Sequence, residues 1–384
     1  MPDIMLIARS FPPVVGGIEN YIYNIYSKLS SDVVIVAPFE QGYSVFDKEQ
    51  DLKIFRTPRF LNFMNKEKMA IFPLFLSAVR VLLRHRIGQI HCDQVQSGII
   101  AYLFKKLFGK PYLVYAYGME ITGGGFHWLK SIVLRNANKV ITISNFTKRS
   151  LINRMKVSDS NIAIVHPGVD TIKFNPNLDY SHIINKYALK GKKVILTVGR
   201  LASKELYKGH DMVIEALPKI SSQIPDIVYL IVGSGGDLER LEGLVQKLGL
   251  EEKVIFVGYI PDEELPLYYS ACDLFIMPSR DKIEKDGRGK KVEGFGIVFL
   301  EANACGKPVI GGRSGGIEDA VIDGMTGLLI DPNNVDEIAK AIIRLLTDDA
   351  LAQRLGKQGR NRVVNELSWE KIAAKVEEVV CNLR

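Results

Sequence analysis

The chain has 384 residues, of which 47% are hydrophobic and 24% charged, with a formal net charge of +7. This length favours two domains, and the composition is that of an ordinary globular protein. The longest apolar run, from Met69 to Val79, has 11 residues, too few to span a bilayer. The chain begins its first predicted strand at Ile4 with no leader in front of it, so we expect a cytoplasmic protein.

The positive charge is concentrated in one half of the chain. Residues 1–190 contain 24 Lys and Arg against 13 Asp and Glu, whereas the remainder contains 26 against 30. This asymmetry predicts a localised anionic partner rather than a protein that binds anions over its whole surface. We expect no nucleic-acid partner.

In the first half, short β-rich apolar runs alternate with amphipathic helical stretches, a pattern typical of parallel α/β sheets. The predicted strands are 4–8, 33–37, 54–56, 89–91, 112–115, 139–143 and 162–165, with helices notably at 18–29, 95–108 and 145–154. The segment His166–Asp170 and the polar stretch up to Lys190 resemble a linker.

The alternation restarts in the second half. The predicted strands are 194–198, 228–232, 254–257, 274–277, 309–310 and 327–329, with helices near 210–222, 237–248, 262–271, 295–304, 316–321 and 335–346. We therefore predict an α/β protein with two Rossmann-like doubly wound domains, 1–187 and 188–367, facing each other across a cleft. The last helix, 368–384, is expected to pack back on the first domain. Ligands bind such sheets at the carboxyl ends of the strands.

The segment Val292–Ala302 reads Val-Glu-Gly-Phe-Gly-Ile-Val-Phe-Leu-Glu-Ala, which places Glu293 and Glu301 around a Gly-x-Gly turn before an apolar helix. Such a turn leaves backbone N–H groups unpaired at a helix N-terminus, where phosphate binds. The two carboxylates can accept hydrogen bonds from the hydroxyls of a sugar nucleotide. The alternative is a plain helix start with Glu301 on the surface, but an unpaired carboxylate between apolar neighbours is costly.

Two further segments have residue types that suit a diphosphate. Arg200 ends the first strand of the second half and Lys208 follows it, so the pair can neutralise a departing diphosphate from two directions. Two surface cations are the alternative, and Lys204 competes for the lysine role. In the first βα turn, Gly16 and Gly17 suit close approach of the backbone to a phosphate or sugar, although a plain tight turn is an alternative.

Tyr259 and Ile260 follow another strand, where their exposed backbone can pair with the edge of a nucleotide base. The sequence contains no Asp-x-Asp and no His/Cys cluster with the spacing of metal ligands. We therefore expect neither a metal site nor a cofactor.

Together, Gly16–Gly17, Arg200, Lys208 and the Glu293–Glu301 motif resemble the retaining glycosyltransferases of family four, which have the GT-B fold. The likeness covers nearly the whole chain and is strongest to the phosphatidylinositol and polysaccharide mannosyltransferase branch. It implies that Glu293 holds hydroxyls of the donor sugar and Glu301 those of the ribose. It also implies that Arg200 and Lys208 hold the diphosphate, and that the amides of Phe295, Gly296 and Ile297 contact donor sugar and phosphate.

The sequence departs from the family pattern in two places. Tyr117, in the segment that ends with Glu120, stands where the family often has a histidine, so both residues are carried over only as acceptor-side positions. Tyrosine is a poor base at neutral pH. The spacing from Arg200 to Lys208 is also longer than is usual in the family, which leaves the choice between Lys204 and Lys208 open.

The resemblance implies a metal-independent retaining transferase that moves a hexose, with mannose favoured, from a GDP- or UDP-linked donor. The acceptor would be a hydroxyl of a lipid-linked or polysaccharide molecule in cell-envelope synthesis. The alternatives are a non-catalytic nucleotide-sugar-binding or membrane-adaptor protein, and an epimerase or phosphorylase of similar fold.

A basic stretch in the first half also predicts peripheral contact with an anionic membrane, on the inner face of the plasma membrane. It has seven cations, Arg56, Arg59, Lys66, Lys68, Arg80, Arg84 and Arg86, against one acid, Glu67, with Phe60, Phe63, Phe72 and Phe75 interleaved. The alternative is a core helix with a solvated basic end.

Overall fold

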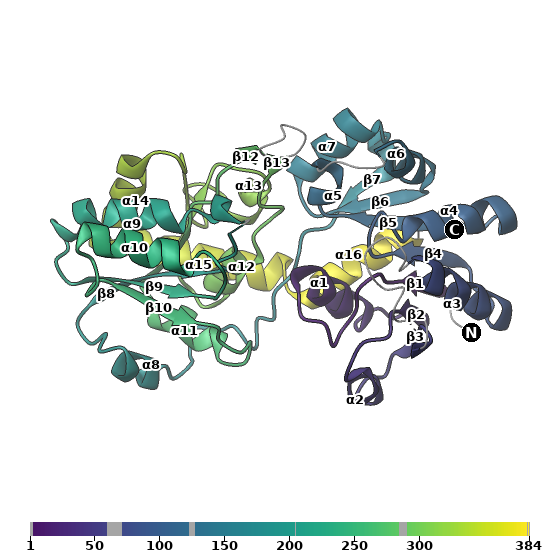
Figure 1. Ribbon diagram of the computed structural model, residues 1–384, viewed down its shortest axis with the longest axis horizontal. Coiled ribbons are helices and arrows are strands. Elements are labelled where there is room, and N and C mark those ends of the chain that lie inside the picture. Colours follow the sequence, from purple (N-terminus) through teal and green to yellow (C-terminus); the bar gives the residue numbers. More distant parts are fainter. Residues whose placement is uncertain are drawn as a thin grey trace. The chain divides into compact units, whose positions relative to one another are not determined.

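The computed structural model describes residues 3–59, 71–122, 127–203, 205–283, 290–381 and 383. The chain forms two compact units, each a parallel sheet with helices packed on it (Figure 1). Unit 1 comprises Met1–Pro167 together with Trp369–Arg384, and unit 2 comprises Gly168–Ser368.

The sheet of unit 1 has seven parallel strands in the order β3-β2-β1-β4-β5-β6-β7. Its strands are β1 (Ile4–Ile7), β2 (Val33–Ala37), β3 (Lys53–Arg56), β4 (Gln89–Cys92), β5 (Tyr112–Ala116), β6 (Lys139–Thr142) and β7 (Ile162–Ile164). Every residue of β1, β2, β4 and β5 is buried, as expected for parallel strands covered on both faces. The strand order reverses between β1 and β4, and ligands bind doubly wound sheets at such a point.

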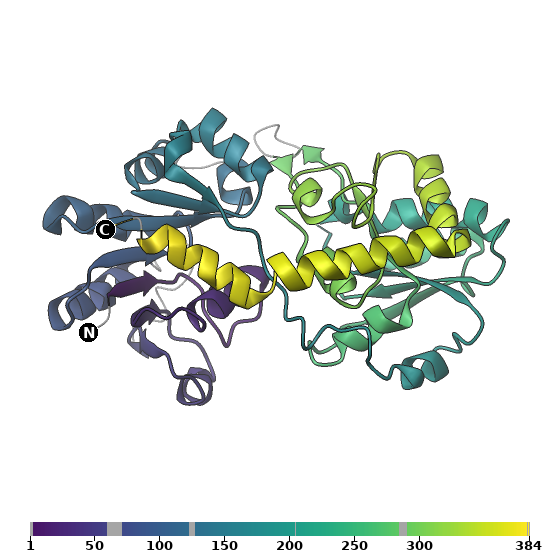
Figure 2. The same ribbon diagram turned by 180° about the vertical axis from the view of Figure 1, so that it is seen from behind.

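Helices of unit 1 cover both faces of this sheet. They are α1 (Gly17–Tyr26), α2 (Tyr43–Lys48), α3 (Ile71–Arg84), α4 (Gly98–Phe108), α5 (Met119–Thr122), α6 (His127–Asn136), α7 (Asn145–Met155) and α16 (Trp369–Cys381). The helix α16, from the end of the chain, lies against α1 (Figure 2), where the Trp369 ring meets the Tyr21 ring edge-on at 6.1 Å. The predicted return of the last helix to the first domain is therefore observed.

The sheet of unit 2 has six parallel strands in the order β10-β9-β8-β11-β14-β15, with the reversal between β8 and β11. Its strands are β8 (Lys193–Val198), β9 (Ile227–Val232), β10 (Val254–Gly258), β11 (Leu274–Met277), β14 (Val309–Gly312) and β15 (Leu328–Ile330), and β12 (Lys282–Ile283) pairs with β13 (Lys290–Lys291) as a separate ribbon. Both sheets confirm the predicted α/β class, and the predicted strands lie within one or two residues of those observed.

The helices of unit 2 are α8 (Ser181–Lys186), α9 (His210–Ser221), α10 (Leu238–Leu248), α11 (Leu265–Ala271), α12 (Ile297–Ala304), α13 (Ile317–Ala320), α14 (Val335–Thr347) and α15 (Asp349–Glu366). The helix α15, which contains Gly356 and Gly359, was not predicted from the sequence. A Cβ at Gly356 would lie 2.1 Å from the carbonyl oxygen of Gly306, and one at Gly359 would lie 2.4 Å from the side chain of Asn303. These glycines allow α15 to pack closely rather than ending the helix.

The boundary between the units differs from the predicted 187/188. Residues 168–187 belong to unit 2, where the Tyr187 hydroxyl lies 3.3 Å from that of Tyr268 and Phe174 packs on Tyr269. The polar composition that resembles a linker therefore belongs to a segment that packs on unit 2 through its few apolar side chains.

Candidate active site

The loops that follow β8, β9 and β10 meet at the carboxyl edge of the unit 2 sheet. The amide of Leu201 donates to Ser234 O at 2.9 Å, and the amide of Gly233 donates to Gly258 O at 2.8 Å. Gly233 has a φ of +142°, and a Cβ there would lie 1.9 Å from the carbonyl oxygen of Gly199. The glycines after β8 and β9 therefore bring the two backbones into direct contact and fix the floor of the site.

The Gly-x-Gly turn lies at the start of α12, as predicted. Gly296 precedes the helix with a φ of +92°, and its carbonyl accepts the amide of Phe299 at 3.1 Å. The Ile297 and Val298 amides come before any carbonyl that the helix itself could offer them. The segment before α13 holds this turn in place, because the amide of Gly316 donates to Glu293 O at 2.9 Å. Gly315, with a φ of +57°, approaches the same carbonyl so closely that a Cβ there would lie 2.2 Å from it. The backbone before α12 is therefore fixed in a form that can receive an anion.

Lys208 and Glu293 come together beside this turn although they are far apart in the sequence. Their side chains are only 13% and 17% exposed, and Lys208 Nζ lies 3.8 Å from Glu293 Oε2. Lys208 ends a short 3-10 turn (Leu206–Lys208), and its aliphatic chain lies over Gly199, where a Cβ would come within 3.3 Å of Cδ. The competing Lys204 lies outside the described residues.

Arg200 lies in the loop after β8 but points into solvent. Its side chain is 79% exposed and pairs with Glu205 at 2.5 Å. Tyr259, after β10, is 72% exposed, and Ile260 beside it is partly exposed. The predicted roles of these three residues in donor binding stay predictions.

Glu301 lies in the second turn of α12 and receives a hydrogen bond that the sequence analysis did not anticipate. The Tyr269 hydroxyl donates to Glu301 Oε2 at 2.7 Å. Burial raises the pKa of Glu301 to about 7, although the hydrogen bond from Tyr269 opposes the rise. The Tyr269 ring is itself buried between Phe174 and Phe275, which fixes the hydroxyl in place. Because Tyr269 stands within an ordinary apolar helix sequence, no local pattern could have singled it out.

Ion pairs that were not predicted from the sequence connect the loops at the carboxyl edge of the unit 2 sheet. Arg280, after β11, donates to Asp211 Oδ2 at 2.7 Å, and Arg240 lies 3.5 Å from the same oxygen. Arg240 also binds Asp237, at the start of α10, at 2.6 Å. These residues connect the first turns of α9 and α10 to the end of β11. They therefore support the positions of Lys208 and the Gly233–Gly236 loop.

In unit 1, the predicted Gly16 and Gly17 lie at the start of α1. Gly16 has extended backbone, and a Cβ there would lie 2.2 Å from Glu19 Oε2, so the glycine leaves room for the carboxylate to fold back over the turn.

Asp93, after β4, was not predicted from the sequence. It is fully buried and accepts hydrogen bonds from the amide of Arg9 at 2.8 Å and the Ser97 hydroxyl at 2.8 Å. Burial raises the pKa of Asp93 to about 7. This carboxylate anchors the loop that leads to Gly16.

The two residues predicted to lie on the acceptor side, Tyr117 and Glu120, follow β5. The amide of Tyr117 donates to Glu120 Oε1 at 2.5 Å, and burial raises the pKa of the Glu120 carboxyl. Burial also raises the pKa of Tyr117 well above its ordinary value, so this side chain cannot act as a base near neutral pH. Its ring packs edge-on against Tyr21 at 5.9 Å. Among the described residues, its hydroxyl has no hydrogen-bond partner.

Fold and site together define an α/β protein with two doubly wound units, in which the glycine-bounded start of α12 lies beside Lys208 and Glu293. Residues 15–173 match the model of glycosyltransferase family 4, and residues 179–362 match that of the glycosyl transferases group 1. The chain belongs to this family of glycosyltransferases.

Relatives at the level of sequence include two mannosyltransferases. The GDP-mannose-dependent alpha-(1-6)-phosphatidylinositol monomannoside mannosyltransferase of Mycolicibacterium smegmatis is 31% identical, with 99% of each chain covered. The protein of the same description from Mycobacterium tuberculosis is 30% identical, with 98% of each covered.

Solved structures share the fold. The Anabaena protein HepE in complex with UDP has a TM-score of 0.82 at 19% identity, with 100% of each chain covered. The sucrose-phosphate synthase of Thermosynechococcus elongatus has a TM-score of 0.78 at 25% identity, covering 100% of this chain and 99% of that one. These structures confirm the predicted fold class, and the family models with the mannosyltransferase relatives confirm the predicted membership of family four.

Proposed function

We propose that this protein transfers a hexose, with mannose favoured, from a nucleotide sugar to a hydroxyl of a lipid-linked or saccharide acceptor in cell-envelope synthesis. The observation that carries the proposal is the convergence of Lys208 and Glu293 beside the first turn of α12. A lysine and free helix amides suit a diphosphate, and a carboxylate suits the hydroxyls of a sugar. The mannosyltransferase relatives, which match over nearly their whole length, support mannose as the hexose.

In the proposed complex, the α12 amides and Lys208 receive the diphosphate, while Arg200 leaves Glu205 and swings onto it. Glu293 turns from Lys208 to the hydroxyls of the donor sugar. Glu301, held by Tyr269, accepts hydrogen bonds from the ribose hydroxyls. A nucleotide sugar thus relieves a lysine–carboxylate contact that is only loosely formed at 3.8 Å. Tyr259 and Ile260 lie where the base can pair with backbone groups.

The proposed chemistry retains the configuration of the sugar. The acceptor oxygen forms its bond to the anomeric carbon on the face from which the diphosphate leaves, and the acceptor proton passes to a diphosphate oxygen. Lys208, Arg200 and the helix amides stabilise the negative charge that develops on the leaving group. Since these groups supply the positive charge, we propose that the reaction needs no metal ion.

Peripheral contact with an anionic membrane is part of the proposal, through α3 and α4 of unit 1. No described helix is long and apolar enough to cross a membrane. The described part of the predicted basic stretch exposes Arg80, Arg84 and Arg86 on α3 and just beyond it. Arg56 does not belong to this surface, because its side chain is 5% exposed and binds Asp47 at 2.6 Å. Phe60, Phe63, Lys66, Glu67 and Lys68 lie outside the described residues.

A panel of nucleotide sugars tests the donor, with thermal stabilisation and transfer to phosphatidylinositol mannoside vesicles as readouts. GDP-mannose is expected to give the largest rise in Tm, and the product should keep the anomeric configuration of the donor. Turnover should persist in EDTA. Loss of turnover in EDTA that Mg²⁺ restores would overturn the metal-independent mechanism.

The site assignment is tested by Glu293→Ala with Glu318→Ala as its control, because Glu318 is an exposed carboxylate in the first turn of α13. Loss of a charged hydrogen-bond partner in the site should lower kcat/KM by about 30- to 1000-fold, from roughly 2–4 kcal/mol. The control should leave kcat/KM unchanged. A Glu293→Ala enzyme within twofold of wild type would rule out the proposed role.

A further inference from the structure

Glu301 of α12 and Tyr269 of α11 form a pair that joins a partly accessible carboxylate to a buried hydroxyl. Tyr269 is fully buried, whereas Glu301 is half-buried, and the hydroxyl donates to Glu301 Oε2 at 2.7 Å. Burial and the nearby charge of Glu301 raise the pKa of Tyr269 well above its ordinary value. The hydroxyl therefore keeps its proton and donates toward the carboxylate at every ordinary pH. Because Tyr269 does not reach solvent, it acts on a ligand only through Glu301.

The Tyr269 ring is held in place on two sides. It packs against Phe174 and Phe275, with 5.8 Å and 5.6 Å between the ring centres. Phe174 is in turn fixed by Arg360 of α15, which donates to the carbonyl oxygen of Phe174 at 2.9 Å and to that of Ala304, at the end of α12, at 2.8 Å. Since Arg360 joins the segment that carries Phe174 to α12, the Tyr269 hydroxyl keeps one position relative to that helix.

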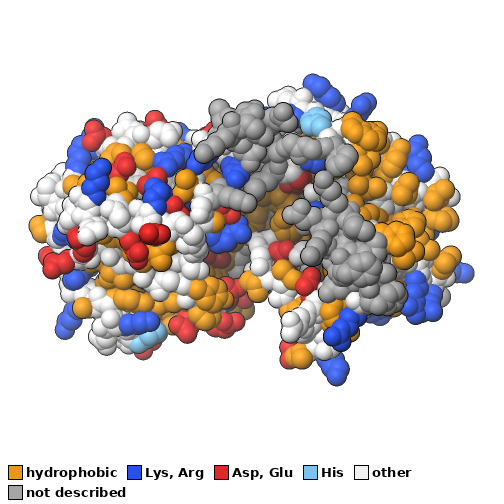
Figure 3. Space-filling model, in the orientation of Figure 1, with side chains coloured by type: hydrophobic (Ala, Val, Ile, Leu, Met, Phe, Trp, Pro, Cys, Tyr) orange, Lys and Arg blue, Asp and Glu red, His pale blue; other side chains and the backbone are white. Residues whose placement is uncertain are grey.

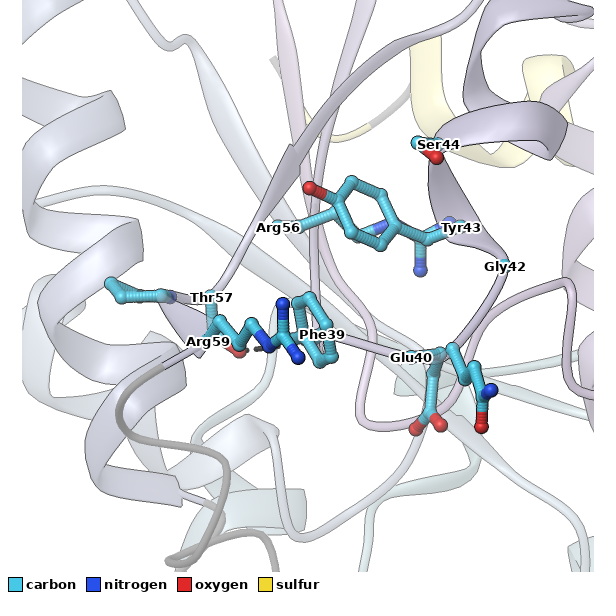
Figure 4. Close-up of a pocket in the computed structure, with 10 residues that line it drawn as sticks. Phe39, Glu40, Gly42, Tyr43, Ser44, Arg56, Thr57 and Arg59 are labelled. Carbon is cyan, nitrogen blue, oxygen red and sulfur yellow. Dashed lines mark hydrogen bonds between the residues drawn. The ribbon is translucent and has the colours of Figure 1, made fainter.

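The carboxylate of Glu301 depends on this one hydroxyl. Among the described residues, no other group donates a hydrogen bond to it. Arg56, one of the residues that line the hollow of unit 1 in Figure 4, shows the opposite arrangement, because its guanidinium donates to both Pro12 O and Asp47 Oδ1. Loss of one partner leaves Arg56 fixed by the other. Loss of the Tyr269 hydroxyl leaves the carboxylate free to turn and changes its ionisation.

The surroundings of Glu301 decide the form in which it meets a ligand. Burial raises its pKa to about 7 against the hydrogen bond from Tyr269, while Asp262, before α11, adds to the rise and Lys173 opposes it. On α15, Arg360 binds backbone carbonyls, and β14, which also packs on α12, has no titratable side chain. Near neutral pH the carboxyl is therefore close to the balance between its two forms, and the hydroxyl of Tyr269 favours the ionised one.

An ionised carboxylate in a fixed orientation suits two neighbouring hydroxyls. Its two oxygens offer about four acceptor positions, of which the Tyr269 hydroxyl occupies one. The others can accept hydrogen bonds from both hydroxyls of a ribose at once, whereas a protonated carboxyl has lost part of this capacity. A carboxylate that is already oriented also loses less conformational freedom when the ligand binds.

We propose that Tyr269 is a positioning residue that selects for the ribose of the donor nucleotide. It keeps Glu301 ionised and in one orientation, so that both ribose hydroxyls donate to the carboxylate. This role rests on the proposed donor binding by Glu301 and adds the residue on which that binding depends. A nucleotide without ribose hydroxyls gains nothing from Tyr269.

Calorimetric titration with GDP and 2′,3′-dideoxy-GDP measures this role without turnover, and UDP with its dideoxy form provides a second pair. The two probes of a pair carry the same diphosphate, so the ratio of their affinities isolates the ribose hydroxyls and cancels the ionisation of the phosphates. In wild type at pH 8, the ribonucleotide should bind on the order of a hundredfold more tightly, since the dideoxy form lacks two hydrogen bonds to a charged group. This ratio should fall about tenfold at pH 6, where Glu301 is mostly protonated.

Tyr269→Phe removes the hydroxyl and keeps the ring that packs on Phe174 and Phe275. The midpoint of the pH dependence should move upward by about one pH unit, because a hydrogen bond to the ionised carboxylate is lost. The affinity ratio should therefore fall about fivefold at pH 7 and recover most of the wild-type value at pH 9. Glu301→Gln should give a small ratio that does not change with pH.

The matched control is Tyr268→Phe, at the neighbouring position of the same helix. Tyr268 is also fully buried, and its hydroxyl contacts that of Tyr187 at 3.3 Å instead of Glu301. This variant should keep the wild-type affinity ratio at every pH. Far-UV circular dichroism and Tm should show that both tyrosine variants are folded.

An affinity ratio that is unchanged in Tyr269→Phe, or lowered equally at every pH, would overturn the positioning role while the donor binding by Glu301 stands. If wild type binds neither ribonucleotide more tightly than its dideoxy form, the roles of Glu301 and Tyr269 are both refuted. Transfer of a hexose from the nucleotide sugar is measured separately. A wild-type ratio that depends on Tyr269, in an enzyme that transfers no hexose, would refute the proposed function and leave the role of Tyr269 in place.

Discussion

Two carboxylates, the buried Asp93 in unit 1 and the half-buried Glu301 in unit 2, accept hydrogen bonds from neutral donors. Asp93 binds backbone amides and Ser97, whereas Glu301 binds the hydroxyl of Tyr269. Neutral donors only partly offset the loss of hydration, so burial raises the pKa of each to about 7. Both groups therefore bind protons more tightly in the folded protein than in the unfolded chain.

This shift makes the stability of unit 1 depend on pH. The Asp93 pKa is about 7 in the folded state against an ordinary 3.8, so its contribution is fully present below about pH 4 and is lost as the pH rises through 7. The free energy of unfolding should fall over this window by on the order of 2–4 kcal/mol more in wild type than in Asp93→Asn. Urea unfolding between pH 4.5 and 8 measures the difference. Asp51→Asn, an exposed carboxylate, serves as control. A parallel decline in wild type and Asp93→Asn would contradict the role of Asp93.

Single residues of the site could be predicted from the sequence only where a local pattern marks them. The Gly-x-Gly turn identifies Glu293 and its helix, because glycine and carboxylate stand side by side in the chain. No local pattern distinguishes Asp93 or Tyr269, because their hydrogen-bond partners come from distant parts of the sequence. The Arg9 amide is 84 positions from Asp93, and Glu301 is 32 positions from Tyr269. Whether these residues hold a donor stays a prediction.

At the scale of elements, the strands were easier to predict than the helices. Buried parallel strands are continuous apolar runs, so the sequence marks them directly. The helix α15 has two glycines and a polar composition, and its close contact with the end of α12 could not be inferred without the fold. The helix α16 was predicted together with its packing on the first domain. Its contact with α1 stabilises this arrangement.

The two tryptophans of the chain test how much α16 contributes to unit 1. Trp369 is 6% exposed and packs on Tyr21, whereas Trp128, at the start of α6, is 64% exposed. Trp369→Ala should lower the free energy of unfolding of unit 1 by about 3–5 kcal/mol, because it leaves a large cavity between α16 and α1. Trp128→Ala should change it by no more than about 0.5 kcal/mol. Denaturant unfolding followed by far-UV circular dichroism measures both. Equal effects of the two substitutions would show that α16 is only loosely attached.

For the molecule as a whole, the charge asymmetry in the sequence coincides with an exposed apolar surface on unit 1. On α3 this surface comprises Phe72, Leu76 and Leu83, and on α4 it comprises Leu103, Leu107 and Phe108. The two helices meet, because Leu83, Phe108, Arg86 and Lys110 line one hollow. Figure 3 shows hydrophobic side chains gathered over α4 with Lys and Arg side chains beside them. The predicted Phe75 is not part of this surface, since it packs inward on Phe104 at 5.7 Å.

An apolar surface bordered by cations suits the interface of an anionic membrane, where leucine and phenylalanine enter the acyl boundary and arginine binds headgroups. The full chain should therefore co-sediment with vesicles that contain phosphatidylinositol or phosphatidylserine, and added salt should weaken this binding. Each cation contributes about 1 kcal/mol, so changing Arg80, Arg84 and Arg86 to Ser should weaken binding by about a hundredfold. A double change of Leu83 and Phe108 to Ser should lower binding while leaving its salt dependence in place.

The control for this experiment removes the same charge from unit 2, by changing the exposed Lys190, Lys192 and Lys340 to Ser. This variant should bind vesicles more tightly than the arginine variant and close to wild type, because a local surface, and not net charge, directs the contact. Equal losses in the two triple variants would mean that the positive charge acts only as a diffuse attraction. Binding that is the same on neutral and anionic vesicles, or absent from both, would exclude this surface and favour an acceptor that reaches the enzyme from solution.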